Sequence, residues 1–317
     1  MRFLVSGLLA GCSALALALP APRAAPADLL ATYVPVFELY RADWKPSAVE
    51  PFLAAADLER FVAGRWRLVR RSPAASSLPP GSKQYRLDTR GCSPAVNVDS
   101  CYRRRPSPPT VYGRVWSSAG PNAAVTVLQY WVFYPLDDWR NSPTRPRLWH
   151  MHEGDWEEVS VELGPAGRPV AVACSQHDLG VTRTWAHVRL SGGTHPVVYV
   201  ALGSHANYLS PGFHGLAGVP HEIPPRFSGV PLPEPDFTST QVAVRPAVVE
   251  LSAAATPWIS FAGAWGDGSF VLLEQATRTG FSWARLRVGD SPTGPAFHSI
   301  WRDPQLQFQA WPADDGH

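Results

Sequence analysis

The chain has 317 residues, which is enough for one large all-β domain with a sizeable core or for two small domains. Its net charge of +2 is too small to indicate a nucleic-acid-binding surface. Its 33 prolines disfavour long helices, and its 13 tryptophans predict a well-packed β core, with exposed aromatic platforms for a sugar or a membrane headgroup as the alternative.

The N-terminus has the pattern of an export signal. A positive Arg2 precedes the apolar residues 3–19, and the small residues around Ala27 match a cleavage site, which predicts a signal peptide at residues 1–27. The rival interpretation is a lipid anchor on Cys12, because the LAGC sequence that ends there resembles a bacterial lipobox. No other stretch is apolar enough to span a bilayer, so we expect a secreted or periplasmic protein whose mature chain has no transmembrane segment.

The elements of the mature chain begin with a predicted helix over residues 46–62, as one helix or two short ones. Residues 72–110 are rich in Ser, Pro, Gly and Arg and predict a long surface loop. Within this loop, Cys92 and Cys101 bracket a turn-rich stretch and are spaced for a disulfide in an oxidising compartment. Cys174 lies in an apolar run, which predicts a buried free thiol.

Strands dominate the rest of the chain. A Pro/Gly-rich loop at residues 211–236 interrupts them, and no linker divides them, so we expect residues 28–317 to form a single antiparallel β-sandwich domain decorated by long loops. The predicted strands, rich in β-branched and aromatic residues, are residues 111–116, 125–134, 156–163, 170–174, 181–190, 197–201, 242–251, 258–261 and 270–273.

The stretch His152-Glu153-Gly154-Asp155-Trp156-Glu157 carries the chemistry. In a strand, Asp155 and Glu157 share one face while Trp156 points into the core, and Gly154 lets the backbone bend so that His152 turns toward the same point. Carboxylates with one imidazole suit Mg²⁺, Ca²⁺ or Mn²⁺, and Asp137 or Asp138 could add a further acid. The alternative is that these are ordinary surface groups of a strand and a loop.

These residues resemble the vacuolar protein sorting-associated protein 62 family. The HEGDWE sequence is the family's signature, and several other motifs occur in the family's order along nearly the whole mature chain. They are residues 33–61, the aromatic strand at 128–135, the SQH at 175–177, residues 195–201, the GSHA at 203–206, the WISFAGAWGD at 258–267 and residues 291–304.

The same stretch is also similar, more distantly, to the necrosis- and ethylene-inducing peptide-like cytolysins. These are secreted β-sandwiches that hold a divalent cation and bind sphingolipid sugar headgroups, and they carry a GHRHDWE heptapeptide. The resemblance implies metal ligation by His152, Asp155 and Glu157, and by Asp137 upstream. This chain departs from the heptapeptide at Gly154, where the cytolysins have a second histidine, so the resemblance implies the metal cluster more strongly than toxicity.

Two further histidines, His177 and His205, follow predicted strands and could face the same cleft, or could simply cap strand ends. Ser204 lacks the G-x-S-x-G elbow of a hydrolase nucleophile. We therefore expect a divalent-cation-binding module that recognises a polar lipid headgroup or a glycan, with no nucleic-acid partner. The alternatives are a metal-assisted hydrolase of phosphodiester or glycosidic bonds, with His177 or His205 as general acid or base, and a non-catalytic structural domain.

Overall fold

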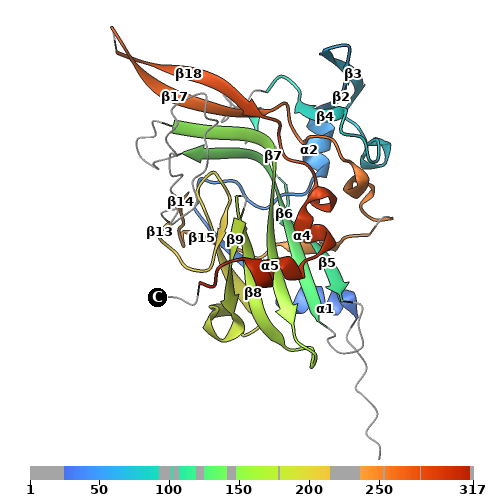
Figure 1. Cartoon of the computed structure of the whole chain (residues 1–317), viewed down its shortest axis with the longest axis vertical. Helices are drawn as coiled ribbons and strands as arrows, with labels where there is room; N and C mark the ends of the chain where they lie inside the picture. The colour runs from blue at the N-terminus through green and yellow to red at the C-terminus, as the bar shows by residue number, and fades with distance from the viewer. Residues whose placement is uncertain are drawn as a thin grey trace, which may run out of the picture.

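The computed structural model describes residues 25–92, 101–102, 107–118, 125–140, 148–177, 179–214, 236–252, 254–278 and 280–314 (Figure 1). The predicted lipid anchor at Cys12 and most of the predicted signal peptide lie outside the described residues, as do residues 215–235 of the predicted Pro/Gly-rich loop.

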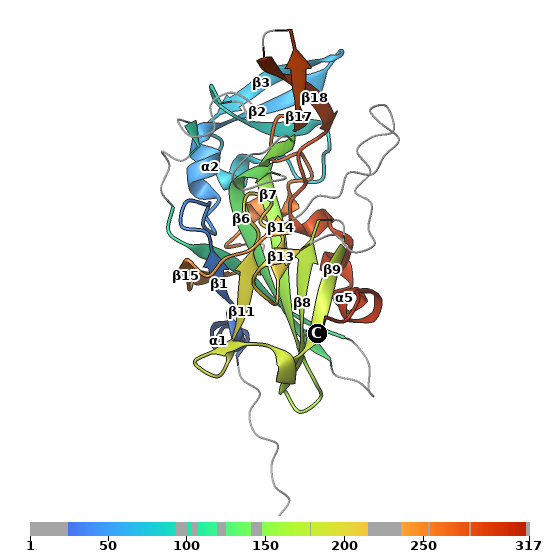
Figure 2. The ribbon, with the colours of Figure 1, turned by 90° about the vertical axis from the view of Figure 1, so that its left-hand side faces the viewer.

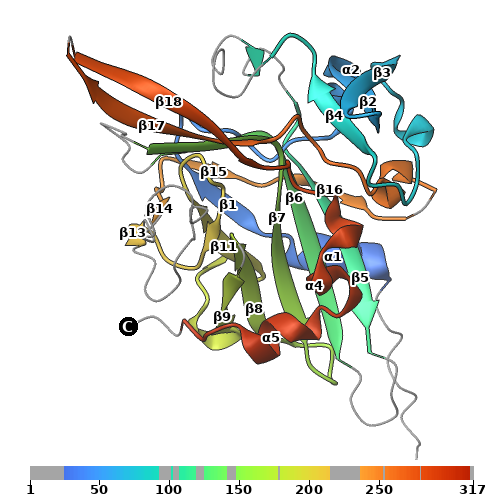
Figure 3. The same ribbon diagram turned by 45° about the horizontal axis from the view of Figure 1, so that its top comes forward.

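Two long antiparallel strands, β6 (Thr126–Arg140) and β7 (Leu148–Leu163), form the centre of the molecule (Figures 1 and 3). In the described residues their sheet runs in the order β16-β5-β6-β7-β17-β18, and β8 and β9 continue it from the C-terminal half of β7. All of its pairs are antiparallel except that of β16 with β5. The other strands are β5 (Thr110–Ser117), β8 (Pro169–Gln176), β9 (Leu179–Thr184), β16 (Ala247–Glu250), β17 (Ser269–Thr277) and β18 (Gly280–Gly289).

A second sheet lies against one face of this ribbon, in the order β10-β11-β1-β15 with β12 paired to β11. Buried side chains of both sheets, such as Tyr130 and Val132 of β6 and Phe37 and Val198 of the second sheet, share one apolar core. The all-β sandwich predicted from the strand spacing is therefore confirmed. The strands are β1 (Val36–Leu39), β10 (Leu190–Ser191), β11 (His195–Val200), β12 (Asn207–Tyr208) and β15 (Val242–Val244).

A second core covers the other face of the ribbon. Trp131, Phe133 and Trp156 pack there with Trp258 and Trp265, all buried. Because both faces of β6 are covered, residues 130–134 read as a continuous apolar and aromatic run instead of an alternating one. The predicted role of tryptophan in core packing is thus confirmed for these residues.

Smaller elements surround the two cores. β2 (Ala56–Val62), β3 (Arg65–Arg71) and β4 (Tyr85–Thr89) form a small sheet, and β13 (Phe213–His214) pairs with β14 (Asp236–Phe237). None of the helices that the structure describes has the length and apolar character needed to cross a bilayer. The helices are α1 (Pro26–Tyr33), α2 (Glu50–Ala55), α4 (Ser299–Arg302) and α5 (Gln305–Ala310), with 3₁₀ turns η1 (Ala75–Ser77), η2 (Trp185–His187), η3 (Pro257–Ser260) and η4 (Pro295–Phe297).

Several local predictions were wrong. The helix expected over residues 46–62 is helical only in α2, and its second half is β2, because pairing with β3 and β4 on both sides outweighs helical periodicity. The surface loop expected at residues 72–110 contains β4, whose Leu87 is buried. The strand expected at residues 258–261 is the 3₁₀ turn η3, which Pro257 begins.

Both cysteine predictions are confirmed. Cys92 and Cys101 form a disulfide, with 5.8 Å between their Cα atoms. Cys174 is a free and fully buried thiol in β8. The disulfide lies one residue before Tyr102, a buried side chain that packs edge-on against Trp44 at 6.4 Å between ring centroids. The bond therefore lies directly beside a residue of the apolar core.

Candidate functional site

The predicted site lies where β6 and β7 leave the apolar core. In the register of the two strands, Asp155 is opposite Tyr134 and His152 is opposite Asp137. Trp156 points into the aromatic core, 5.2 Å from both the Trp258 and Trp265 rings. The strand alternation that places Trp156 in the core turns its two neighbouring carboxylates to the opposite face.

Gly154 has the backbone geometry that this position requires. Its φ is +65°, in the left-handed region that favours glycine, and a Cβ here would lie 2.1 Å from the carbonyl oxygen of Trp265. A larger residue would therefore push β7 away from the aromatic core.

Asp137 and His152 form one ion pair of the site. The His152 Nε2 lies 3.2 Å from a carboxylate oxygen of Asp137, and the other carboxylate oxygen accepts a 2.8 Å hydrogen bond from the Trp139 backbone amide. Burial alone would lower the pKa of His152, but Asp137 outweighs burial and raises it, and Asp155 adds to the effect. Burial would likewise raise the pKa of Asp137, and the charge of His152 lowers it instead.

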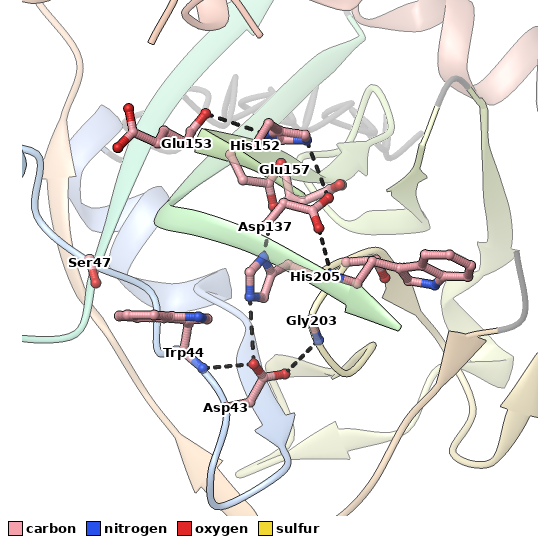
Figure 4. A network of polar contacts seen from close by, with 12 residues as sticks. Asp43, Trp44, Ser47, Asp137, His152, Glu153, Glu157, Gly203 and His205 are labelled. Carbon is pink, nitrogen blue, oxygen red and sulfur yellow. Dashed lines mark hydrogen bonds and ion pairs between the residues drawn. The ribbon is translucent and has the colours of Figure 1, made fainter. Parts of the chain in front are cut away.

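His205 is the centre of the second group. Its imidazole is fully buried, lies flat on the Tyr134 ring at 3.8 Å between centroids, and donates from Nδ1 to Asp155 at 2.8 Å. Its Nε2 faces Asp43 at 3.7 Å, which is too long for a hydrogen bond (Figure 4). Burial lowers the pKa of His205, but the two carboxylates outweigh it and raise the pKa to about 10.

Two buried polar atoms at this point have no hydrogen-bond partner: the Nε2 of His205 and the Oη of Tyr134. The charges of Asp155, Asp43 and Glu157 all contribute to the raised pKa of Tyr134, after burial itself, which places this hydroxyl within the field of the three carboxylates. Buried polar atoms in folded proteins are almost always satisfied, so these two call for a polar partner such as water, an ion or a ligand.

Glu157 lies next to this group. It accepts a hydrogen bond from the hydroxyl of Ser175, and burial together with the neighbouring Asp155 raises its pKa well above the ordinary value. His177 contributes to the same electrostatic environment and binds Asp236 at 3.0 Å. Of the two histidines predicted to face the site, His205 contacts Asp155 directly, whereas His177 contacts Asp236 and affects Glu157 only through its charge.

Asp236 gathers three donors. It accepts hydrogen bonds from His177, from the Ser204 hydroxyl at 2.7 Å and from the Tyr208 hydroxyl at 2.6 Å. Burial would raise the pKa of Asp236, but the His177 charge and these hydrogen bonds lower it. Ser204 therefore has a structural hydrogen bond, in keeping with the absence of a nucleophile motif around it.

Asp43 connects the site to a neighbouring pocket. It follows β1, accepts a 3.0 Å hydrogen bond from the Gly203 amide, and lines a pocket of about 260 Å³. The pocket's other polar groups include the ion pair of Asp138 with Arg140, at 2.7 Å, and burial raises the pKa of Asp138 to about 6. The full lining is Tyr40, Ala42, Asp43, Asp138, Arg140, Leu202, Gly203 and Gln241.

The four predicted metal ligands are not arranged as a finished coordination shell. Across the part of the chain that the structure describes, no group of three or more His, Cys, Asp or Glu side chains is positioned to hold a metal ion. Asp137 and His152 form one pair, and Asp155 and Glu157 form another. Holding a cation would therefore require side chains of the two pairs to move closer together.

Sequence reasoning missed Asp43 and Asp236. Asp43 follows a strand inside the family's opening segment, and Asp236 ends the Pro/Gly-rich loop, so position next to a strand was the one available signal. Their contacts to His205 and His177 span many residues of sequence and become visible only when the sheets have assembled.

The comparisons with known proteins confirm a distant similarity to the proteins that the motifs resemble. No protein-family model matches the chain. It is 26% identical over 213 residues to vacuolar protein sorting-associated protein 62 of Saccharomyces cerevisiae, covering 57% of this chain and 43% of that protein. It is 27% identical over 183 residues to the yeast putative vacuolar protein sorting-associated protein TDA6, covering 49% and 38%. The chain spans less than half the length of these relatives.

Solved structures with a loosely similar architecture include a "toxin fold for microbial attack and plant defense", with 16% identity, a TM-score of 0.43, and coverage of 92% of this chain and 95% of that one. Another is NLPPya in complex with glucosamine, with 14% identity, a TM-score of 0.41, and coverage of 91% and 92%.

Proposed function

We propose that this protein is a divalent-cation-dependent binding module that recognises a hydroxyl-rich polar ligand, a glycan or a lipid headgroup, at the Asp43 pocket. The observation that supports this most is the group of buried carboxylates around two polar atoms without a hydrogen-bond partner, Tyr134 Oη and His205 Nε2. Buried polar atoms of this kind call for a polar partner close by. The Cys92–Cys101 disulfide supports a place of action outside the reducing cytosol, as a secreted or periplasmic protein.

The proposed cation ligands are Asp137, His152, Asp155 and Glu157. This donor set, with three carboxylates and one imidazole, suits Mg²⁺ or Ca²⁺, with Mn²⁺ also compatible. A cation between the carboxylates would offset the repulsion that raises the pKa of Glu157. A bound cation of this kind supplies open positions that sugar hydroxyls or phosphate oxygens can fill.

The pocket supplies hydrogen-bonding groups of both kinds for such a ligand. Arg140 donates, Asp43 accepts, and Gln241 does both. Its volume of about 260 Å³ is below that of most drug-sized sites, at about 300–1,000 Å³, which suits a single sugar ring or headgroup.

The test is calorimetric titration of the purified chain with MgCl₂, CaCl₂ and MnCl₂, followed by methyl glucoside and glycerol phosphate. Glu157→Gln keeps the shape of the side chain and its ability to accept from Ser175, so the fold is expected to survive. We expect it to weaken cation binding by about tenfold or more, whereas the same substitution of Glu162, further along β7, changes nothing. A wild-type chain that binds none of the three cations overturns the proposal.

A structural role is the second candidate, and the His205 contacts favour it specifically. His205, Asp155 and Asp43 connect β7 to the ends of β1 and β11, and Gly203 is bonded to the same carboxylate. If this is the whole function, Asp155→Asn lowers the unfolding temperature and the wild type binds no cation.

For the hydrolase alternative, His205 is poorly suited to act as a general base. A base must be unprotonated at the working pH, and the pKa of this imidazole is raised to about 10 by its two carboxylates after they outweigh burial. His177, held by Asp236 and less buried, is the better candidate of the two.

A further inference from the structure

The β2–β3 hairpin projects from the body of the protein. It lies at the end of the long axis opposite α1, where the β17–β18 hairpin also reaches outward (Figures 1 and 2). Its tip is Ala63-Gly64, and four large apolar side chains near it are about half exposed: Phe61 (48%), Val62 (45%), Leu68 (49%) and Val69 (52%). Trp66 lies against Phe61, with 5.2 Å between ring centroids.

The same hairpin is strongly basic. Residues 60–71 contain five arginines and no acidic residue. Further down the sheet, Arg86 pairs with Glu59 and Arg90 pairs with Asp57. By contrast, the arginines of β3 have no carboxylate partner among the described residues. These arginines are Arg65, Arg67, Arg70 and Arg71.

Two of these charges oppose each other. Arg60 and Arg67 are direct partners in the β2–β3 register, a like-charge arrangement that destabilises a strand pair. Arg60 is partly accommodated by a contact with Gln84 and by its position 5.7 Å from the centre of the Tyr85 ring. The hairpin thus retains unpaired positive charge at a cost to its own stability.

Edge protection explains only half of this pattern. Charged residues on an edge strand such as β3 prevent its pairing with another chain. A strand protected in this way has no reason to expose Leu68, Val69 and the apolar tip as well. Exposed apolar and aromatic side chains among arginines are typical of a surface that enters the interface of a negatively charged bilayer.

We infer that the β2–β3 hairpin docks the protein on an anionic lipid bilayer, with Phe61 and Val62 entering the interface and Arg65, Arg67, Arg70 and Arg71 binding lipid phosphates. This surface shares no residue with the cation cluster. Docking therefore needs no divalent cation and persists in EDTA, which separates it experimentally from the proposed function of the pocket.

The experiment is co-sedimentation of the full chain with vesicles of phosphatidylcholine alone or with about 30 mol% phosphatidylserine, in EDTA. Arg65→Gln/Arg67→Gln is compared with the control Arg168→Gln/Arg302→Gln, which removes two exposed arginines from other surfaces. Binding to the anionic vesicles is expected to fall about 25-fold in the hairpin variant, at about fivefold for each arginine, and to be unchanged in the control. Phe61→Ser is expected to weaken binding with the charge intact.

Circular dichroism and thermal melts check that each variant is folded. Wild-type binding at about 0.1 M salt should be lost at about 0.5 M, since surface charges are screened there. Equal binding to both kinds of vesicle overturns the inference, and so does equal loss in the hairpin and control variants. A hairpin-dependent affinity for duplex DNA without affinity for vesicles would assign the surface to nucleic acid and overturn it as well.

Discussion

The two halves of the β6–β7 ribbon share one register but bury opposite kinds of side chain. On the face toward the second sheet, Leu128 is paired with Val161 and Tyr130 with Val159, and all are fully buried in the apolar core. Further along the same pair of strands, Asp155 is also buried, but charge interactions with neighbouring side chains hold it in place.

The pairing of the two strands therefore fixes which residues face the interior, but it does not decide whether those residues are apolar or charged. Burial of the apolar half is favourable by itself, whereas a buried charge is tolerated only while each partner is in place. Replacing such charges by apolar groups is often neutral or stabilising in other proteins. Stability alone therefore gives no reason for the polar half, and this is why we assign function to it.

Removing Asp155 is expected to have the largest effect. Asp155→Ala leaves the buried imidazole of His205 with only the 3.7 Å contact to Asp43, so we expect a loss of about 3–5 kcal/mol in the free energy of unfolding. Urea denaturation measures it. A loss below about 1 kcal/mol would show that the ion group is not essential to the fold.

A substitution in the apolar half of the ribbon gives the matching comparison for the Asp155 variant. Leu128→Ala removes a fully buried side chain and leaves a cavity, with an expected loss of about 2–5 kcal/mol. Because no charge is involved, this loss should be the same with and without divalent cations and across neutral pH. A cation-dependent difference would mean that the two halves are coupled.

Gly154→Ala tests the bend in β7 between the polar half and the apolar half of the ribbon. The substitution forces a side chain into the left-handed region and against the Trp265 carbonyl oxygen, so we expect a loss of more than about 2 kcal/mol. Gly167→Ala, at a turn with a similar positive φ and open space around it, is the control and should lose only about 1–2 kcal/mol. Equal losses would show that the contact with Trp265 is unimportant.

The pH dependence of stability tests the charge of His205 by itself. The pKa of His205 is raised from 6.5 to about 10 in the folded chain, so its charge stabilises the fold fully below about pH 6.5, and this contribution is lost as the pH rises through about 10. Unfolding free energies at pH 6 and pH 9 in the wild type and in His205→Gln measure the slope. A slope that survives in His205→Gln would assign it to another group.

The alternation of side chains along the sequence predicted those features of the site that depend only on residues adjacent in the chain. The alternation of Asp155, Trp156 and Glu157 and the glycine before them are local properties, so the sequence was sufficient to place Trp156 in the core and Gly154 at a bend. The spacing of the strand-like segments likewise predicted a β-rich architecture, and the ordered motifs predicted a distant similarity that sequence comparison confirms.

The remaining parts depend on tertiary contacts. Asp43 meets His205 only because β1 lies parallel beside β11, a pairing between segments about 160 residues apart. Similarly, residues 56–62 have the apolar spacing of a helix but become a strand because two other strands are available to pair with them. Partners of this kind cannot be read from a local window of sequence.

The buried thiol of Cys174 gives this molecule a built-in reporter of local opening. It lies in β8, paired with Val159 of β7 on one side and with Val181 of β9 on the other, and the two other cysteines of the described chain are bonded to each other. A thiol reagent can therefore label Cys174 only when β8 separates from its neighbours. The labelling rate measures how often the sheet opens next to Glu157, without any engineered probe.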